Sequence, residues 1–204
     1  MTTEPTLSPL RIGVLGSGKG SNFKAIAAQI AEGKLNAEIA VVLSDVAGAG
    51  ILEYAREMGI PAIAFDPGKF RTKLEPEIEA KVAAIFEEHR VELVVLAGFM
   101  RIVKHDLLTK FSRRIINIHP SLLPKHRGLH AWEQALLAGD NVTGCTVHYV
   151  DRGIDTGEII AQAEVPVEPG DVPETLHARI QAAEHELYPR VIAGFCENRS
   201  PEPE

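Results

Sequence analysis

The chain is 204 residues long, with 45% hydrophobic and 24% charged residues, a balance typical of a soluble globular protein that buries its own core. Its net charge of −7 excludes a general nucleic-acid-binding protein, which needs a basic face, and no apolar run is long enough to span a membrane. Two cysteines are too few for a disulfide framework and the polar N-terminus lacks the features of a signal peptide, so we expect a cytoplasmic protein.

The first part of the chain alternates short apolar runs with helical patterns. The runs are too short for helices and rich in Val, Ile and Leu; they cover residues 11–15, 39–44, 62–65, 93–97 and 115–118. The helical patterns cover about residues 22–32, 50–58 and 73–89. Strand alternating with helix predicts an α/β, Rossmann-like fold, with a mostly parallel twisted sheet and helices on both of its faces.

The pattern changes after residue 119. A helix is expected near residues 131–137, and strands at 143–150 and 159–165 predict antiparallel pairing in the C-terminal part. The last helix begins at GDVPETL, where Asp171 can cap, Pro173 fits the first turn and Glu174 completes a capping box, and it runs to about residue 193. No repeat or linker interrupts the chain, so we expect one domain over residues 1–204, with flexible tails at 1–10 and 197–204.

A glycine-rich segment, GSGKGSN (residues 16–22), follows the first predicted strand and leads into a helix. Glycines there let backbone N–H groups converge on an anion, and the helix N-terminus adds its positive dipole end. The spacing matches neither the dinucleotide pattern G-x-G-x-x-G nor the triphosphate pattern G-x-x-x-x-G-K-S/T. We therefore expect Gly20, Ser21 and Asn22 to hold a phosphate monoester, with Ser21 as the helix cap. A tight turn without a ligand is the alternative.

A second candidate site lies at NIHPSLLP (residues 117–124), where a buried strand ends. Asn117 and His119 alternate along the strand, so both side chains point to the same face. Ligands of open parallel sheets bind outside the C-terminal ends of the strands, which favours a functional site over a structural histidine. Two prolines stiffen the following loop, and we expect the Leu123–Pro124 bond to be cis.

An acidic loop, VDRGIDTGE (residues 150–158), carries Asp151 and Asp155. Its spacing lacks the regular oxygen ligands of a calcium loop, which leaves an acidic turn or a carboxylate that reaches His119. In the second case the carboxylate favours imidazolium and can raise the pKa of His119 above about 6.5. His119 would then act as an acid or electrophile near neutral pH.

Other chemistries find less support. Four histidines gather in this region, at positions 119, 126, 130 and 148, but no paired cysteines or second cluster give a zinc signature, so no metal is expected. Cys145 lies within an apolar strand and is expected to be a core residue. No G-x-S-x-G elbow of a serine hydrolase is present.

The last predicted helix carries two stripes at helical spacing. The polar stripe consists of His177, Gln181, Glu184 and Tyr188. The core stripe consists of Leu176, Ile180, Ala183, Leu187 and Val191. Glu184 is suited to accept hydrogen bonds from ribose hydroxyls, whereas His177 and Tyr188 also fit a solvated face.

Five segments together resemble one family: GSGKGSN, VVLAGFMRI, NIHPSLLPKHRGLHAWEQAL, GCTVHYVDRGIDTGEII and RIQAAEHELYP. They occur in the order and spacing of the phosphoribosylglycinamide formyltransferases, and the resemblance covers about residues 11–191. It implies transfer of a formyl group from 10-formyltetrahydrofolate, a co-substrate, to the primary amine of 5'-phosphoribosylglycinamide in purine biosynthesis. His126–Arg127 departs from the aromatic–Pro pair that is commoner in the family.

The resemblance also implies roles for individual residues. The catalytic trio is Asn117, His119 and Asp155, in which Asn117 and protonated His119 stabilise a tetrahedral oxyanion and Asp155 tunes His119. The residues implied to bind phosphoribosylglycinamide are Gly20, Ser21, Asn22, Gln181 and Glu184. The residues implied to contact folate are Lys73 (or its rival Arg71), Met100, Arg101, Ile102, Val103, Asn117, Asp151, Arg152, Gly153, Ile154 and Asp155.

Two other classes of function stay open. One is a different formyltransferase or a hydrolase that uses 10-formyltetrahydrofolate, and the other is a non-catalytic nucleotide or folate sensor. A formyltransferase acting on initiator tRNA would need a basic surface, which the charge of −7 disfavours. We expect small-molecule substrates, no nucleic-acid or membrane partner, and either a monomer or a homodimer.

Overall fold

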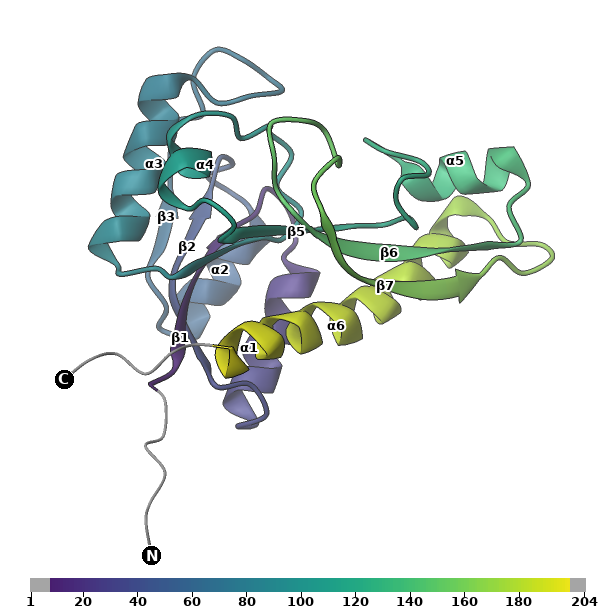
Figure 1. Ribbon diagram of the computed structural model, residues 1–204, viewed down its shortest axis with the longest axis horizontal. Coiled ribbons are helices and arrows are strands. Elements are labelled where there is room, and N and C mark those ends of the chain that lie inside the picture. Colours follow the sequence, from purple (N-terminus) through teal and green to yellow (C-terminus); the bar gives the residue numbers. More distant parts are fainter. Residues whose placement is uncertain (1–7, 199–204) are drawn as a thin grey trace, which may run out of the picture.

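A computed structural model describes residues 8–198. A seven-stranded sheet in the order β3-β2-β1-β4-β5-β6-β7 forms its centre. The strands are β1 (Leu10–Leu15), β2 (Ala37–Ser44), β3 (Ala62–Ala64), β4 (Leu93–Leu96), β5 (Ile115–His119), β6 (Val142–Tyr149) and β7 (Ile159–Pro166). β1 to β5 run parallel, whereas β6 and β7 are antiparallel additions at one edge (Figure 1). The predicted mostly parallel sheet with antiparallel C-terminal strands is confirmed.

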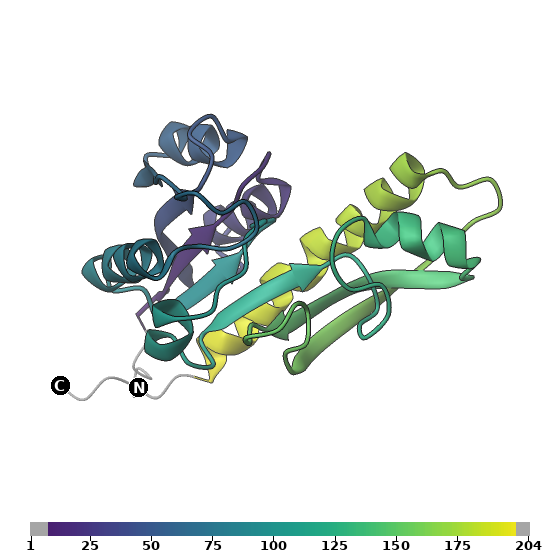
Figure 2. The ribbon, with the colours of Figure 1, turned by 90° about the horizontal axis from the view of Figure 1, so that it is seen from above.

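Helices cover both faces of the sheet, as predicted. They are α1 (Ser21–Ala31), α2 (Gly50–Glu57), α3 (Pro76–Glu88), α4 (Asp106–Lys110), α5 (Ala131–Ala138) and α6 (Pro173–Glu197). One hydrophobic cluster joins the sheet to α1, α2 and α6, and a second joins the other face to α3 and α4. Figure 2 shows α6 running lengthwise along the sheet, from the β6–β7 hairpin to the parallel strands. Among residues 8–198, no helix is both long and apolar enough to cross a membrane.

Strand β4 shows why the parallel strands read as continuous apolar runs. All four of its side chains are buried. Leu93 and Val95 belong to the cluster on one face, and Val94 and Leu96 to the cluster on the other. Successive side chains of a strand point to opposite faces of the sheet. Since helices cover both faces, the side chains on both are apolar, and the sequence does not alternate between apolar and polar residues here.

Some predicted boundaries were wrong. The third helix begins at Pro76 rather than at Lys73, because proline suits the first helical turn, whereas Lys73 forms a β-bridge and the N-cap Glu75 is extended. The short helix α4 was not predicted; its length of five residues leaves no helical period to detect. The last helix continues beyond residue 193 to Glu197, and Leu10 begins β1, so the predicted tails are shorter at their inner ends. Residues 1–7 and 199–204 of the predicted tails lie outside the described residues.

The predicted helix caps were also wrong. Gly20, with φ 78°, is the N-cap of α1, and Ser21 is its first helical residue. At α6 the N-cap is Val172, whose N–H is accepted by Thr175 Oγ1 at 3.0 Å, in place of a box formed by Asp171 and Glu174. Asp171 instead accepts the Thr175 hydroxyl at 2.8 Å. The helix starts one residue later than predicted because Pro173 takes the first helical position.

Candidate active site

From β1 to β3 the successive strands are added toward one edge of the sheet, and from β4 to β7 they are added toward the other edge. The strand order therefore reverses between β1 and β4. Ligands of open α/β sheets bind at such a point, outside the C-terminal strand ends. The glycine loop follows β1 there, and residues 97–103 follow β4. Ser17 N donates to Gly98 O at 3.1 Å, so the two loops lie side by side. Gly20 requires its glycine, because an added Cβ would lie 2.9 Å from the Ile51 Cβ and φ is positive.

Strand β5 carries Asn117 and His119 on one face, as its alternation predicted. His119 is 5% exposed. Its Nε2–H donates to the His126 carbonyl at 2.9 Å, and its Nδ1 lies 3.4 Å from Asp155 Oδ2. The structure therefore brings the strand end and the acidic loop together, although they are far apart in the sequence. Asp155, and not Asp151, is the aspartate that reaches the imidazole.

Asp155 is held in place by the loop that follows β5. It adopts φ 50°, an uncommon value for a non-glycine residue, and its Oδ2 accepts the Gly128 N–H at 2.9 Å. In the same loop the Leu123–Pro124 bond is cis, as predicted. The His126 carbonyl and the Gly128 N–H thus fix the imidazole and the carboxylate from one short segment. Asp151 instead closes its own turn, accepting Gly153 N and Thr156 Oγ1 at 2.9 and 2.7 Å.

His148 is a fourth member of the cluster, and no role was predicted for it. It is 2% exposed and lies opposite Asn117 in the β5–β6 pairing. Its Nδ1–H donates to Tyr149 O at 2.8 Å, and its Nε2 lies 3.2 Å from the Asn117 amide nitrogen. Nε2 also lies 3.7 Å from Asp155 Oδ1. The register between β5 and β6 places His148 opposite Asn117, but the sequence alone does not show that these two strands pair.

The expected rise in the pKa of His119 was wrong for the protein without ligands. Burial, which disfavours the charged ring, outweighs the opposing effects of Asp155 and the His126 carbonyl, so the pKa of His119 is lowered. Burial alone would raise the pKa of Asp155, but the two imidazoles and the Gly128 N–H outweigh it and that pKa is lowered. The resting pair is therefore a neutral imidazole beside a carboxylate at neutral pH.

Two of the predicted substrate residues, Asn22 on α1 and Glu184 on α6, are in contact. Asn22 Nδ2 donates to Glu184 Oε2 at 2.8 Å, across 162 positions of sequence, and both residues are buried. Burial raises the pKa of Glu184 to about 7, against a smaller lowering by Asn22. Asn22 Oδ1 is buried and has no hydrogen-bond partner among residues 8–198. Gln181, one turn earlier on α6, is half-buried.

The polar stripe of α6 is not a solvated face. Tyr188 is fully buried, and its hydroxyl lies 3.0 Å from the carbonyl oxygens of Leu96 and Ile116. His177 stacks on Trp132 with ring centroids 3.8 Å apart. The predicted core stripe is buried except for Ala183, which is partly buried against the same cluster.

The predicted folate residues lie on two neighbouring segments and a loop. Lys73 forms an isolated parallel bridge with Ile102, and its Nζ lies 4.3 Å from the centroid of the Phe70 ring. Both Lys73 and Arg71 are exposed, so either can turn to a ligand. Met100 is 59% exposed and Val103 is buried. Asp151 to Ile154 form an exposed loop that ends at the partly exposed Asp155, and the side chains of Arg101 and Ile102 are partly buried.

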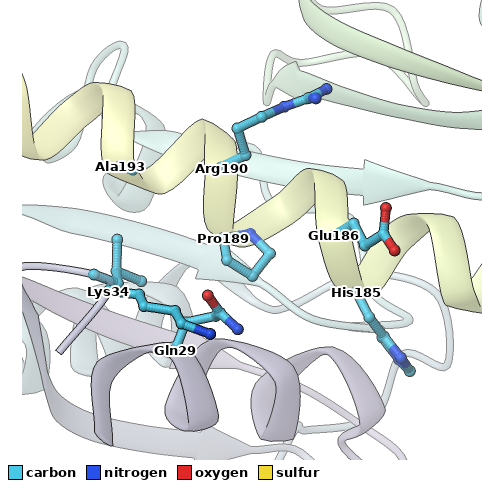
Figure 3. Close-up of a pocket in the computed structure, with 8 residues that line it drawn as sticks. Gln29, Lys34, His185, Glu186, Pro189, Arg190 and Ala193 are labelled. Atoms are coloured by element: carbon cyan, nitrogen blue, oxygen red, sulfur yellow. The ribbon is translucent and has the colours of Figure 1, made fainter. Parts of the chain in front are cut away.

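Two cavities lie outside this cluster. One of about 310 Å³ lies between α1 and α6, lined by residues such as Gln29, Lys34 and His185, and none of its lining residues was predicted to be functional (Figure 3). The second, of about 320 Å³, lies behind the acidic loop and includes Asp151 and Arg152 in its lining. Neither cavity therefore coincides with the cluster of Asn117, His119, His148 and Asp155.

Metal and thiol chemistry find no site in the described part of the chain. Residues 8–198 contain no group of three or more His, Cys, Asp or Glu side chains placed to hold a metal ion. Cys145 is a buried core residue, as predicted, and burial raises the pKa of its thiol to about 12. At neutral pH it is a thiol and not a thiolate nucleophile.

Comparison with known proteins gives concordant matches. A family model described as formyl transferase matches residues 10–192. The phosphoribosylglycinamide formyltransferase of Bacillus subtilis is 43% identical over 185 residues, which span 89% of this chain and 92% of that protein. The trifunctional purine biosynthetic protein adenosine-3 of Drosophila pseudoobscura pseudoobscura is 47% identical over 185 residues, 90% of this chain. This chain spans only 13% of that protein's length.

Solved structures agree with these matches. The crystal structure of glycinamide ribonucleotide transformylase 1 from Symbiobacterium toebii superposes with a TM-score of 0.89 at 47% identity. The match covers 94% of this chain and 90% of that one. The similarity therefore extends over the sheet, the glycine loop and the β5 strand end together.

Proposed function

This chain belongs to the formyl transferase family, and on that premise we propose that it formylates the primary amine of 5'-phosphoribosylglycinamide, with 10-formyltetrahydrofolate as donor, in purine biosynthesis. The observation that carries the proposal is the meeting of Asn117, His119 and Asp155 at one strand end. Such a group supplies hydrogen-bond donors for an oxyanion and a carboxylate that stabilises positive charge beside it.

The amine substrate is proposed to bind along α1 and α6. The first N–H groups of a helix have no intrahelical partner, so those of Gly20, Ser21 and Asn22 are suited to the phosphate, which the helix dipole also favours. The Glu184 carboxyl and the unpartnered Asn22 Oδ1 are suited to the ribose hydroxyls. Gln181 is proposed to bind at the edge of the same site.

The folate donor is proposed to bind along the segment after β4. Ile102 in this segment forms a parallel bridge with Lys73, and main-chain groups on such a segment can hydrogen-bond the edge of a pteridine ring. Lys73 or Arg71, both exposed, is proposed to meet the carboxylates of the folate tail. The exposed loop of residues 151–155 is proposed to fold over the ring from the other side.

The chemical step is attack of the substrate amine on the formyl carbon. A C–N bond forms, the formyl oxygen becomes an oxyanion, and the amine becomes cationic. The Asn117 amide, which points at His148 Nε2 without ligands, is the candidate first donor to that oxygen. Removing one oxyanion donor from such a site typically lowers kcat about 100- to 1,000-fold.

His119 is proposed to take up a proton from solvent as the oxyanion forms and to return it when the formyl C=O bond is restored. Its pKa is lowered in the resting site because burial outweighs Asp155, and an oxyanion beside the ring adds a second negative charge that favours imidazolium. Its Nε2–H must exchange the His126 carbonyl for the substrate, since that bond occupies it without ligands. The amine proton then moves to the departing N10 as the C–N10 bond breaks, through a water that Asp155 can orient.

The test is an assay with both substrates and mass spectrometry of the product. The proposal requires a product heavier than phosphoribosylglycinamide by one formyl group in place of hydrogen. A hydrolase would release formate from 10-formyltetrahydrofolate at the same rate without the amine substrate. A sensor would bind both compounds and give neither product. Either of these outcomes would refute the proposed transfer.

A further inference from the structure

Three side chains that follow three neighbouring strands form a cluster that has no part in the proposed chemical step. Ser17 follows β1, Asp45 follows β2 and Arg101 follows β4, and these strands are adjacent in the sheet. Ser17 Oγ donates to Asp45 Oδ1 at 2.6 Å, and Arg101 Nε donates to Asp45 Oδ2 at 2.6 Å. The cluster is not a surface ion pair, because the side chains of Asp45 and Arg101 are 4% and 13% exposed.

The cluster joins the two segments proposed to hold the two substrates. Ser17 belongs to the glycine loop, just before the proposed phosphate site at Gly20. Its Oγ also accepts the Met100 N–H at 3.0 Å, at the start of the proposed folate segment. Arg101, next along that segment, reaches the Phe70 carbonyl as well. Each oxygen of Asp45 therefore fixes one of the two binding segments.

We propose that Asp45 is a positioning residue that sets the glycine loop and the folate segment relative to each other, so that binding at both substrate sites depends on it. The inference rests on the proposed function for the identity of the two substrates. Asp45 is directed at Ser17 and Arg101, so it acts through them. Losing a buried carboxylate that holds two donors frees both segments at once, and each ligand must then order its own segment.

The test compares four variants with the wild type. Asp45→Ala removes both bonds and Ser17→Ala removes the bridging hydroxyl. Asp45→Asn keeps an acceptor for Arg101 and a donor for Ser17 Oγ. Glu38→Ala is the matched control, because Glu38 and Arg11 form an exposed 2.8 Å ion pair that also joins β1 and β2, at their opposite ends. KM for both substrates and kcat are measured, with calorimetric Kd values for ribose 5-phosphate and 5,8-dideazafolate as probes.

We expect Asp45→Ala to raise both KM values and both Kd values about tenfold, the range of a lost charge-assisted bond, with little change in kcat. Ser17→Ala should shift the same four constants in the same direction, Asp45→Asn should restore most of the loss, and Glu38→Ala should change none. The inference is overturned if Asp45→Ala and Ser17→Ala leave the constants of either site at the wild-type value. If the wild type binds both probes without formyl transfer, the proposed function fails while the Kd comparison still decides this inference.

Discussion

Replacing Glu184 by Gln should stabilise the protein at neutral and alkaline pH and not in acid. Glu184 is 5% exposed, and its hydrogen bond from Asn22 Nδ2 does not offset the loss of water around the charged carboxylate. Burial therefore raises the pKa of Glu184 from 4.5 to about 7. A glutamine side chain has nearly the same shape and can still accept the Asn22 amide, but it cannot ionise.

The size of the effect follows from this pKa difference. One pKa unit corresponds to about 1.4 kcal/mol, so a rise from 4.5 to about 7 corresponds to roughly 3 kcal/mol. Because the pKa is higher in the folded protein, the protonated carboxyl supports folding fully below pH 4.5, and this support is lost as pH rises to about 7. The Glu184→Gln variant has no carboxyl at this position, so it loses none of this stability over the same pH range. Its advantage in unfolding free energy should grow from near zero to at most about 3 kcal/mol.

Urea unfolding of both proteins from acid to mildly alkaline pH, across the window in which Glu184 titrates, measures this difference directly. Glu186→Gln is the control, because Glu186 lies nearby on the same helix and is exposed. A Glu184→Gln advantage that is constant across pH, or a variant less stable than the wild type in mild alkali, would refute the reasoning from burial.

Three further predictions concern the strand end. His119→Asn should lower formyl transfer at least 100- to 1,000-fold while calorimetric binding of both substrates stays near normal; wild-type turnover would end the proposed mechanism. Asp155→Asn removes the carboxylate that raises the His119 pKa, so the ionisation seen in the pH–rate profile should move to lower pH, and an unchanged profile would contradict the tuning. Tyr188→Phe leaves two buried carbonyl groups without their shared donor and should cost about 1–3 kcal/mol in urea unfolding, whereas an unchanged midpoint would mean that water replaces the hydroxyl.

The spacing of apolar residues and the alternation of side chains along strands predicted most of the fold. The inner parallel strands, such as β4, are apolar runs because both of their faces are covered, and turn residues mark their ends. The two-residue spacing of Asn117 and His119 predicted that they share a face, which depends only on local geometry. The start of the third helix could have been predicted better, since Pro76 is a stronger signal than the periodicity around Lys73.

Properties set by partners distant in sequence could not be predicted in the same way. His148 joins the cluster because β6 pairs with β5 in an antiparallel register, which no local sequence pattern predicts. The pKa of His119 depends on how far the effect of burial outweighs that of one nearby carboxylate. The sequence shows the carboxylate but not how deeply the imidazole is buried. Tyr188 lies in a polar stripe, but α6 packs against α1 on one side and the sheet on another, so more than one stripe is buried.

The order of the strands in space explains why one edge can serve two substrates. Going across the sheet from β2 through β1, β4 and β5 to β6, the C-terminal ends of the parallel strands supply Asp45, the glycine loop, the folate segment and the Asn117–His119 pair, and β6 adds His148. These residues are neighbours in the sheet although they lie far apart in the sequence. Helix α6 then crosses the same strands and anchors to Leu96 and Ile116 through Tyr188, one turn after Glu184. The proposed ribose site is therefore fixed to the two strands that carry the proposed folate segment and the reacting side chains, which is the arrangement that transfer between two bound molecules requires.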